Sequence, residues 1–320
     1  MACQHQHTSY CFFVPTSPRP GLARLISLVG AAIGIAGVAF VTKTLITRWD
    51  DVSNAFQQVD APNLILSLLL GLSAMTSIGW IWVSMISTKG HSVAHRRAMR
   101  WYFTGQLGKY VPGGIWPIVG RAELAARNGV SRKDAYASTG LSLVTTYLAA
   151  IVAIAIGAAF SPGRWPISIL IASALVIGYY VFSHEKLRTK VITIAIKISP
   201  AAQSLTEPKR LATLTLMHLP SWILMSLSTS VTASAFGAHI GIFQMLFITS
   251  TSWLAGFVVV GVPGGIGVRE AIFTSLAGGI IGTPLAVSLA LMSRVVFIAV
   301  DLTGALVSNL AAQGARSVEA

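Results

Sequence analysis

Seven apolar segments, each long enough to cross a lipid bilayer as a helix, recur along the 320 residues and constrain the fold more than any other feature. Only 10% of the residues are charged, against about 25% in soluble proteins, and the mean hydropathy is +0.71. We therefore predict an all-α polytopic membrane protein with about seven transmembrane helices, within a range of six to eight. The expected spans are 24–46, 62–86, 134–159, 165–183, 211–236, 240–260 and 283–309.

The charges between the spans predict the orientation. Basic side chains dominate Lys89–Lys133 and Glu185–Arg210, which indicates cytoplasmic loops, whereas Asp50, Asp51 and Asp60 fit the outside. This places the N-terminus on the cytoplasmic side of the cell membrane and the C-terminus on the outer side, unless a further crossing reverses the C-terminal side. We interpret the net charge of +13 as loop charge facing anionic lipid and predict no nucleic-acid partner. The expected organisation is a tail at 1–20, one transmembrane domain at 21–310 and a tail at 311–320.

The pentapeptide VPGGI occurs twice, 151 residues apart, and an arginine and a glutamate follow each copy. The first copy contains Pro112, Gly113 and Gly114, followed by Arg121 and Glu123; the second contains Pro263, Gly264 and Gly265, followed by Arg269 and Glu270. A capped apolar helix then begins near Ser131 or Thr283. We predict an internal two-fold repeat, with broken re-entrant or interfacial segments near 106–135 and 257–286. Counting spans makes it a parallel repeat; a hidden crossing would make it inverted.

Each break has the composition of a phosphate site. Glycine lets the backbone approach a ligand, a helix beginning after the break presents free N–H groups, and arginine offers a fork of donors to phosphate oxygens. Glutamate can hold that arginine when no ligand is bound. The competing interpretation is an ordinary surface loop retained by duplication.

Two ionisable residues, Arg294 and Asp301, lie inside the last apolar segment. Each would cost about 2.5–3.5 kcal/mol at the centre of a lipid-facing helix, so both should face the protein interior or a cavity. They share a helix face but lie about 10 Å apart along the axis. Arg294 is therefore expected to meet Glu270, Glu123 or a lipid phosphate; a purely structural ion pair between helices is the alternative.

The two repeats also resemble a known family. The stretch QLGKYVPGGIWP at 106–117, with Arg121, is similar to the first signature of the lysylphosphatidylglycerol synthase transmembrane-region family. The stretch VPGGIGVREA at 262–271, with Arg294 and Gly304, is similar to the second. The resemblance extends from the first span to about Leu310 and implies an integral membrane protein with a flippase-like fold.

In the fullest members of that family, this region moves aminoacylated phosphatidylglycerol between leaflets, and a separate C-terminal domain makes the lipid. The present chain ends about ten residues after its last expected span, so the resemblance implies that it does not synthesise the lipid. Stand-alone members include many without an assigned substrate, and some resemble membrane parts of glycosyltransferase systems. The family often carries an acidic residue in the span after the first signature, where this chain has Ser142.

The resulting functional hypothesis is a lipid translocator for an anionic phospholipid or a lipid-linked phosphate. The alternative is a non-catalytic membrane subunit that presents lipid to a separate synthase or glycosyltransferase. We predict no enzymatic activity, because no catalytic constellation is evident, and no cofactor. His91 and His95 are four residues apart but have no adjacent glutamate or third ligand, so no metal site is predicted. The oligomeric state stays open.

Overall fold

The computed structural model is all-helical in the residues it describes, which are 42–43, 46–47, 49–57, 59–87, 93–110, 116–198, 207–259 and 263–314. Most of the expected first span at 24–46 lies outside these residues, as do the expected tail at 1–20 and Pro112, Gly113 and Gly114 of the first break. The helices are α2 (Trp49–Gln57), α3 (Ala61–Ser87), α4 (His95–Gln106), η1 (Leu107–Tyr110), α5 (Trp116–Ala126), α6 (Arg132–Ala159), α7 (Trp165–Ser183), α8 (Glu185–Ile198), α9 (Pro208–Ala235), α10 (Ile242–Val258), η3 (Pro263–Gly265), α11 (Val268–Ile281) and α12 (Thr283–Gly314).

Five of these helices are long and apolar enough to cross a membrane: α3, α6, α7, α9 and α12. They correspond to five of the predicted spans, with boundaries that differ by a few residues. The cap predicted before α6 is present, since the Ser131 hydroxyl accepts a hydrogen bond from the backbone N–H of Asp134 at 3.2 Å. The apolar runs and their polar caps thus produce the helices for the reason expected.

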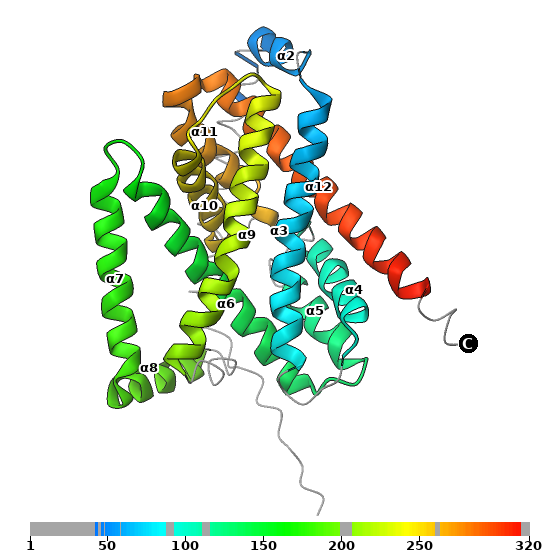
Figure 1. Cartoon of the computed structure of the whole chain (residues 1–320), viewed down its shortest axis with the longest axis vertical. Coiled ribbons are helices and arrows are strands. Elements are labelled where there is room, and N and C mark those ends of the chain that lie inside the picture. The colour runs from blue at the N-terminus through cyan, green and yellow to red at the C-terminus, as the bar shows by residue number, and fades with distance from the viewer. Residues whose placement is uncertain are drawn as a thin grey trace, which may run out of the picture.

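Two similar halves are visible in the order of the elements. The first half comprises α3, the hairpin of α4 and α5, and α6; the second comprises α9, the hairpin of α10 and α11, and α12. Figure 1 shows that the α4–α5 hairpin inserts into the bundle from the end where α3 stops and α6 starts, whereas the α10–α11 hairpin inserts from the opposite end. The two halves therefore run in opposite directions, which corrects the expectation of a parallel repeat.

The second hairpin also corrects the predicted span at 240–260. Met245 near the start of α10, Ala277 near the end of α11 and Ala286 near the start of α12 belong to one buried cluster, so α10 enters and α11 returns at the same end. Hydropathy alone cannot separate such an arm from a crossing, because α10 has 17 apolar-rich residues and carries no charge.

This hairpin changes where the chain ends. Near the end of α12, the Asn309 amide donates a hydrogen bond to the hydroxyl of Thr104 in α4 at 3.4 Å. The last turns of α12 therefore lie beside α4 and not at the end of the bundle where α12 begins (Figure 1). The predicted outer C-terminus depends on the segment 240–260 being a seventh crossing, so it does not follow from this arrangement.

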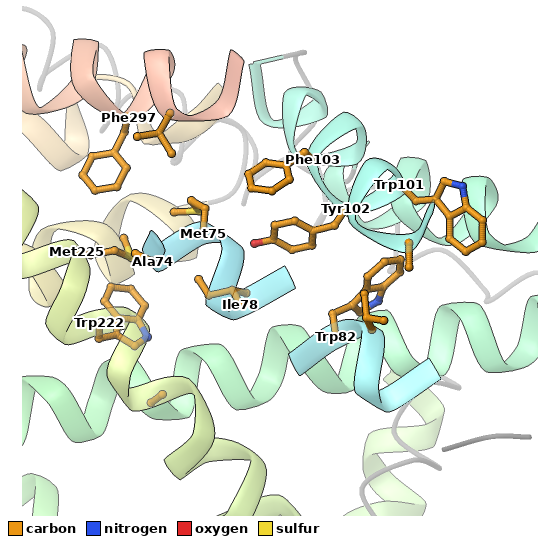
Figure 2. Packing of buried hydrophobic residues seen from close by; sticks show 14 of the residues in the cluster. Ala74, Met75, Ile78, Trp82, Trp101, Tyr102, Phe103, Trp222, Met225 and Phe297 are labelled. Carbon is orange, nitrogen blue, oxygen red and sulfur yellow. The ribbon is translucent and has the colours of Figure 1, made fainter. Parts of the chain in front are cut away.

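The core lies where the two halves meet. Ser67 of α3 and Ser228 of α9 donate hydroxyl hydrogen bonds to each other's backbone carbonyls, both at 2.8 Å. Around this contact, aromatic and methionine side chains from α3, α4, α9 and α12 form the largest buried cluster, part of which Figure 2 shows. In contrast, α7 has no buried residue and contacts the bundle mainly through α6, so its surface is left for lipid.

Candidate functional site

The second break is built around glycines with positive φ. Gly264 and Gly265 have φ values of 56° and 66°, a left-handed conformation that L side chains rarely adopt. A Cβ at Gly265 would lie 2.7 Å from the Cα of Gly256 in α10, so the two backbones touch. A Cβ at Gly264 would lie 3.4 Å from the carbonyl oxygen of Lys109, which belongs to the first signature. Lys109 belongs to η1, directly before the first break, so η1 and the second break meet inside the bundle, and Pro263 starts η3, the short helix of the second break.

Glu270 ties this break to the last helix. One carboxylate oxygen receives the backbone N–H of Gly267 at 2.7 Å, and the other binds the Arg294 guanidinium at 2.6 Å. The predicted contact between Arg294 and Glu270 is confirmed. The start of α11 is less open to a ligand than expected, because Glu270 already occupies the Gly267 N–H.

Arg269, the neighbouring residue, has no such partner. Its guanidinium lies 4.0 Å from the ring centre of Trp253 and 5.4 Å from that of Phe297, and the residue is 9% exposed. Within the described chain, no carboxylate forms an ion pair with it. The expected orienting role of Glu270 thus applies to Arg294 and not to Arg269, which rests on aromatic rings.

Asp301 joins the last helix to the first signature. Its carboxylate forms an ion pair with the Lys109 ammonium at 2.6 Å and accepts a hydrogen bond from the Tyr110 hydroxyl. Asp301 is fully buried. Sequence reasoning placed Asp301 in the interior but missed Lys109 and Tyr110 as its partners. The available signal was a lysine and a tyrosine directly before the first VPGGI.

Arg121 occupies the corresponding position in the first half. Its guanidinium lies 4.9 Å from the ring of Tyr102 and 5.4 Å from that of Trp82, and its Nε has no hydrogen-bond partner among the described residues. A Cβ at Gly105 of α4 would lie 2.9 Å from the Arg121 Cβ, just as a Cβ at Gly256 of α10 would lie 3.2 Å from that of Arg269. Each hairpin therefore packs a glycine of its first arm against the arginine of its second arm.

Glu123 lies away from this interior. Its carboxylate accepts hydrogen bonds from Arg132 at 2.9 Å and from Tyr136 at 3.0 Å, at the polar end of α5. These hydrogen bonds lower the pKa of the Glu123 carboxyl below its usual range. The expectation that Glu123 orients Arg121 differs from the structure, because the side chain turns toward the start of α6.

Two neighbouring cavities collect these groups. The first, with a cavity volume of about 20 Å³, is lined by Arg269, Arg294 and Lys109, among others. The second, of about 100 Å³, is lined by Arg121 and again by Lys109. Both also share Trp253 and Phe257 in their walls, so the cavities adjoin beside η1.

Three hydrogen-bond donors in these walls have no partner among the described residues: the Tyr102 hydroxyl, the Arg121 Nε–H and the Trp253 indole N–H. Figure 2 shows the Tyr102 hydroxyl pointing toward Met75 and Met225, which line the same cavity. Buried donors are normally satisfied, so this arrangement suits a bound acceptor.

The net charge of the interior also favours a bound anion. Among the described residues, four interior cations (Lys109, Arg121, Arg269 and Arg294) face two interior carboxylates (Glu270 and Asp301), which leaves a net charge of +2. A buried excess of positive charge is costly unless an anion compensates it. The described residues contain no group of three or more side chains suited to holding a metal ion. Chemically, the cavities are therefore suited to binding an anion.

The helices and cavities together define a multi-pass helical membrane protein with two opposed hairpins and buried cations between them. Residues 27–303 match the family model described as the lysylphosphatidylglycerol synthase TM region, so the chain belongs to this family. The match covers both breaks, both hairpins and all five long helices up to the first two-thirds of α12. No curated protein matches the chain.

Proposed function

We propose that this protein translocates a lipid with an anionic headgroup, a phospholipid or a lipid-linked phosphate, between the two leaflets of the cell membrane. The observation that carries the proposal is the pair of buried arginines, Arg121 and Arg269, which line adjoining cavities between opposed hairpins and form no ion pair with a carboxylate of the described residues. A phosphodiester is the anionic group common to these lipids, and guanidinium groups match its oxygens.

In the proposed membrane arrangement, the α4–α5 and α10–α11 hairpins are re-entrant. The five long helices and the expected span at 24–46 give six crossings, within the range predicted from the sequence. The basic segments between α3 and α4, after α5 and along α8 then face the cytoplasm, and so do both termini. The hairpins form an inverted repeat, an arrangement that places a binding site near the middle of the membrane in many transporters.

The proposed path uses the two cavities in turn. The headgroup phosphate binds Arg121 in one cavity and Arg269 in the other, and Lys109 contributes to both walls. The ion pairs Lys109–Asp301 and Arg294–Glu270 keep the remaining charges in place. The acyl chains stay in the lipid phase, because moving them out of this apolar environment would cost free energy. This path assigns no chemical reaction to the chain.

The decisive experiment is leaflet exchange of labelled phosphatidylglycerol in liposomes that contain only this protein. Arg269→Ala removes one charge-assisted contact, worth about 1.5–3 kcal/mol, so exchange should slow roughly tenfold to a hundredfold. The matched control is Arg127→Ala, which removes the same group from an exposed position at the end of α5 and should exchange at the wild-type rate.

Two results would overturn the proposal. Arg269→Ala exchanging as fast as wild type would show that the buried guanidinium has no role in the path. A correctly folded wild-type protein that exchanges no lipid would favour the alternative role, in which a non-catalytic subunit presents lipid to a separate synthase or glycosyltransferase.

A further inference from the structure

The positions of the carboxylates restrict which headgroup the cavities accept. The sequence contains ten aspartates and glutamates. Apart from Glu270 and Asp301, the other eight lie in the first or last turn of a helix, directly before a helix, or in the C-terminal segment. Among the residues whose burial the structure describes, only Glu270 and Asp301 are acids of the interior, and each already forms an ion pair with a cation of this chain.

Neither cavity has a carboxylate in its described wall. The second oxygen of Asp301, Oδ1, has no partner among the described residues, but Asp301 lines neither cavity. The neutral polar groups of the larger cavity are amide and hydroxyl groups, including those of Gln106 and Ser142. The neighbouring stretches outside the described residues, 88–92, 111–115 and 260–262, contain no aspartate or glutamate either.

Aromatic faces could hold an ammonium group in place of a carboxylate, but cations of this chain already lie over several of the rings in these walls. Arg269 lies over Trp253, and Arg121 lies over Tyr102 and Trp82. Lys109 lies 5.6 Å from the Trp253 ring as well. An incoming ammonium would therefore meet like charges at each of these rings, which is unfavourable in a cavity of low dielectric.

We infer that the two cavities select anionic headgroups without an ammonium group and discriminate against amine-bearing lipids. Phosphatidylglycerol, with one net negative charge and neutral hydroxyls, represents the accepted class. Phosphatidylethanolamine and lysylphosphatidylglycerol, which share its phosphate but carry amines, represent the rejected class. This inference rests on the proposed function, since it names the substrate class of the same site.

Equilibrium binding of short-chain lipids to the purified protein in detergent tests the selectivity separately from transport. We expect wild type to bind phosphatidylglycerol at least about tenfold more tightly than either amine-bearing lipid, a difference of about 1.4 kcal/mol. Equal affinity for lysylphosphatidylglycerol would overturn the inference. Displacement of phosphatidylglycerol by an equimolar amount of inorganic phosphate would assign the site to a free anion and also overturn it.

A charge introduced into the cavity should change the selectivity. Gln106→Glu adds a carboxylate beside Arg121 without changing side-chain size. It should weaken phosphatidylglycerol binding about tenfold and raise the relative affinity for lysylphosphatidylglycerol by a similar factor. If this variant misfolds, Ser142→Asp adds a carboxylate to the same wall, and Ser142→Asn is its neutral control of equal size. Unchanged selectivity in a folded acidic variant, matching its neutral counterpart, would contradict the inference.

Leaflet exchange with the same three lipids separates the two proposals. Selective binding without any exchange would refute translocation while supporting the selectivity. Exchange of all three lipids at one rate would refute the selectivity while supporting translocation.

Discussion

Removing one partner of the ion pair between Lys109 and Asp301 should lower the free energy of unfolding more than removing both partners together. The ammonium and carboxylate lie 2.6 Å apart, and their side chains are only 10% and 1% exposed. Asp301→Asn keeps the size and can still accept the Tyr110 hydrogen bond, but it leaves the Lys109 charge buried and uncompensated. Losing one member of a buried pair costs about 3–5 kcal/mol.

The structure favours the lower end of that range. Lys109 lines both cavities, so water there can solvate part of its charge once the carboxylate is gone. We therefore expect Asp301→Asn to lower the free energy of unfolding by about 3 kcal/mol, roughly a 150-fold change in the folding equilibrium. Reversible unfolding in mixed micelles measures this difference directly.

A double-mutant cycle tests the cause. In Asp301→Asn the Lys109 charge is left without a partner, and Lys109→Met removes that charge. The double variant should therefore recover most of the lost stability, with a coupling energy of at least about 2 kcal/mol. It should nevertheless exchange lipid more slowly than wild type, because Lys109 belongs to both cavity walls. Asp301→Asn unfolding within about 0.5 kcal/mol of wild type, or purely additive effects in the cycle, would refute the reasoning.

Three further perturbations address the rest of the site. Glu123→Gln should leave lipid exchange at the wild-type rate, because Glu123 binds Arg132 at the polar end of α5. Glu270→Gln should slow exchange, because it releases Arg294. Equal effects of the two variants in the liposome assay would contradict this assignment. Gly265→Ala should lower the free energy of unfolding by at least about 2 kcal/mol, since it combines a left-handed backbone with a 2.7 Å contact, whereas Gly279→Ala, with nothing within 4 Å, should be neutral or slightly stabilising; reversible unfolding of both variants decides. A topology reporter fused at Ala320 should read as cytoplasmic, and an external signal would reject the proposed six crossings.

The sequence was sufficient for the elements whose cause is local. Apolar runs and polar caps predicted α3, α6, α7, α9 and α12. The high cost of a charge in lipid also predicted that Arg294 faces the interior, and the pairing with Glu270 was among the expected contacts. These features depend on composition and on neighbours along the chain, which a single sequence displays.

The features that could not be predicted are tertiary. α10 reads as a crossing because nothing in its composition records that α11 returns beside it. The sequence predicted no partner for Asp301. Lys109 and Tyr110 lie more than 190 residues earlier in the chain and meet it only when the two hairpins converge. The opposed direction of the halves was equally hidden, since direction depends on the number of true crossings.

Two glycines outside the pentapeptide, Gly105 and Gly256, give both hairpins the same close packing. Arg121 packs against Gly105 and Arg269 packs against Gly256, each a glycine of the preceding hairpin arm. Because glycine has no side chain, the two arms approach closely enough to bury the guanidinium. Opposed insertion then brings the two arginines to adjoining cavities from opposite ends of the protein, with Lys109 in the wall between them. A parallel repeat would have put both arginines at the same end. The inverted arrangement instead lets each hairpin carry one buried arginine to these cavities from its own end of the bundle, as the proposed movement of an anionic headgroup across a membrane requires.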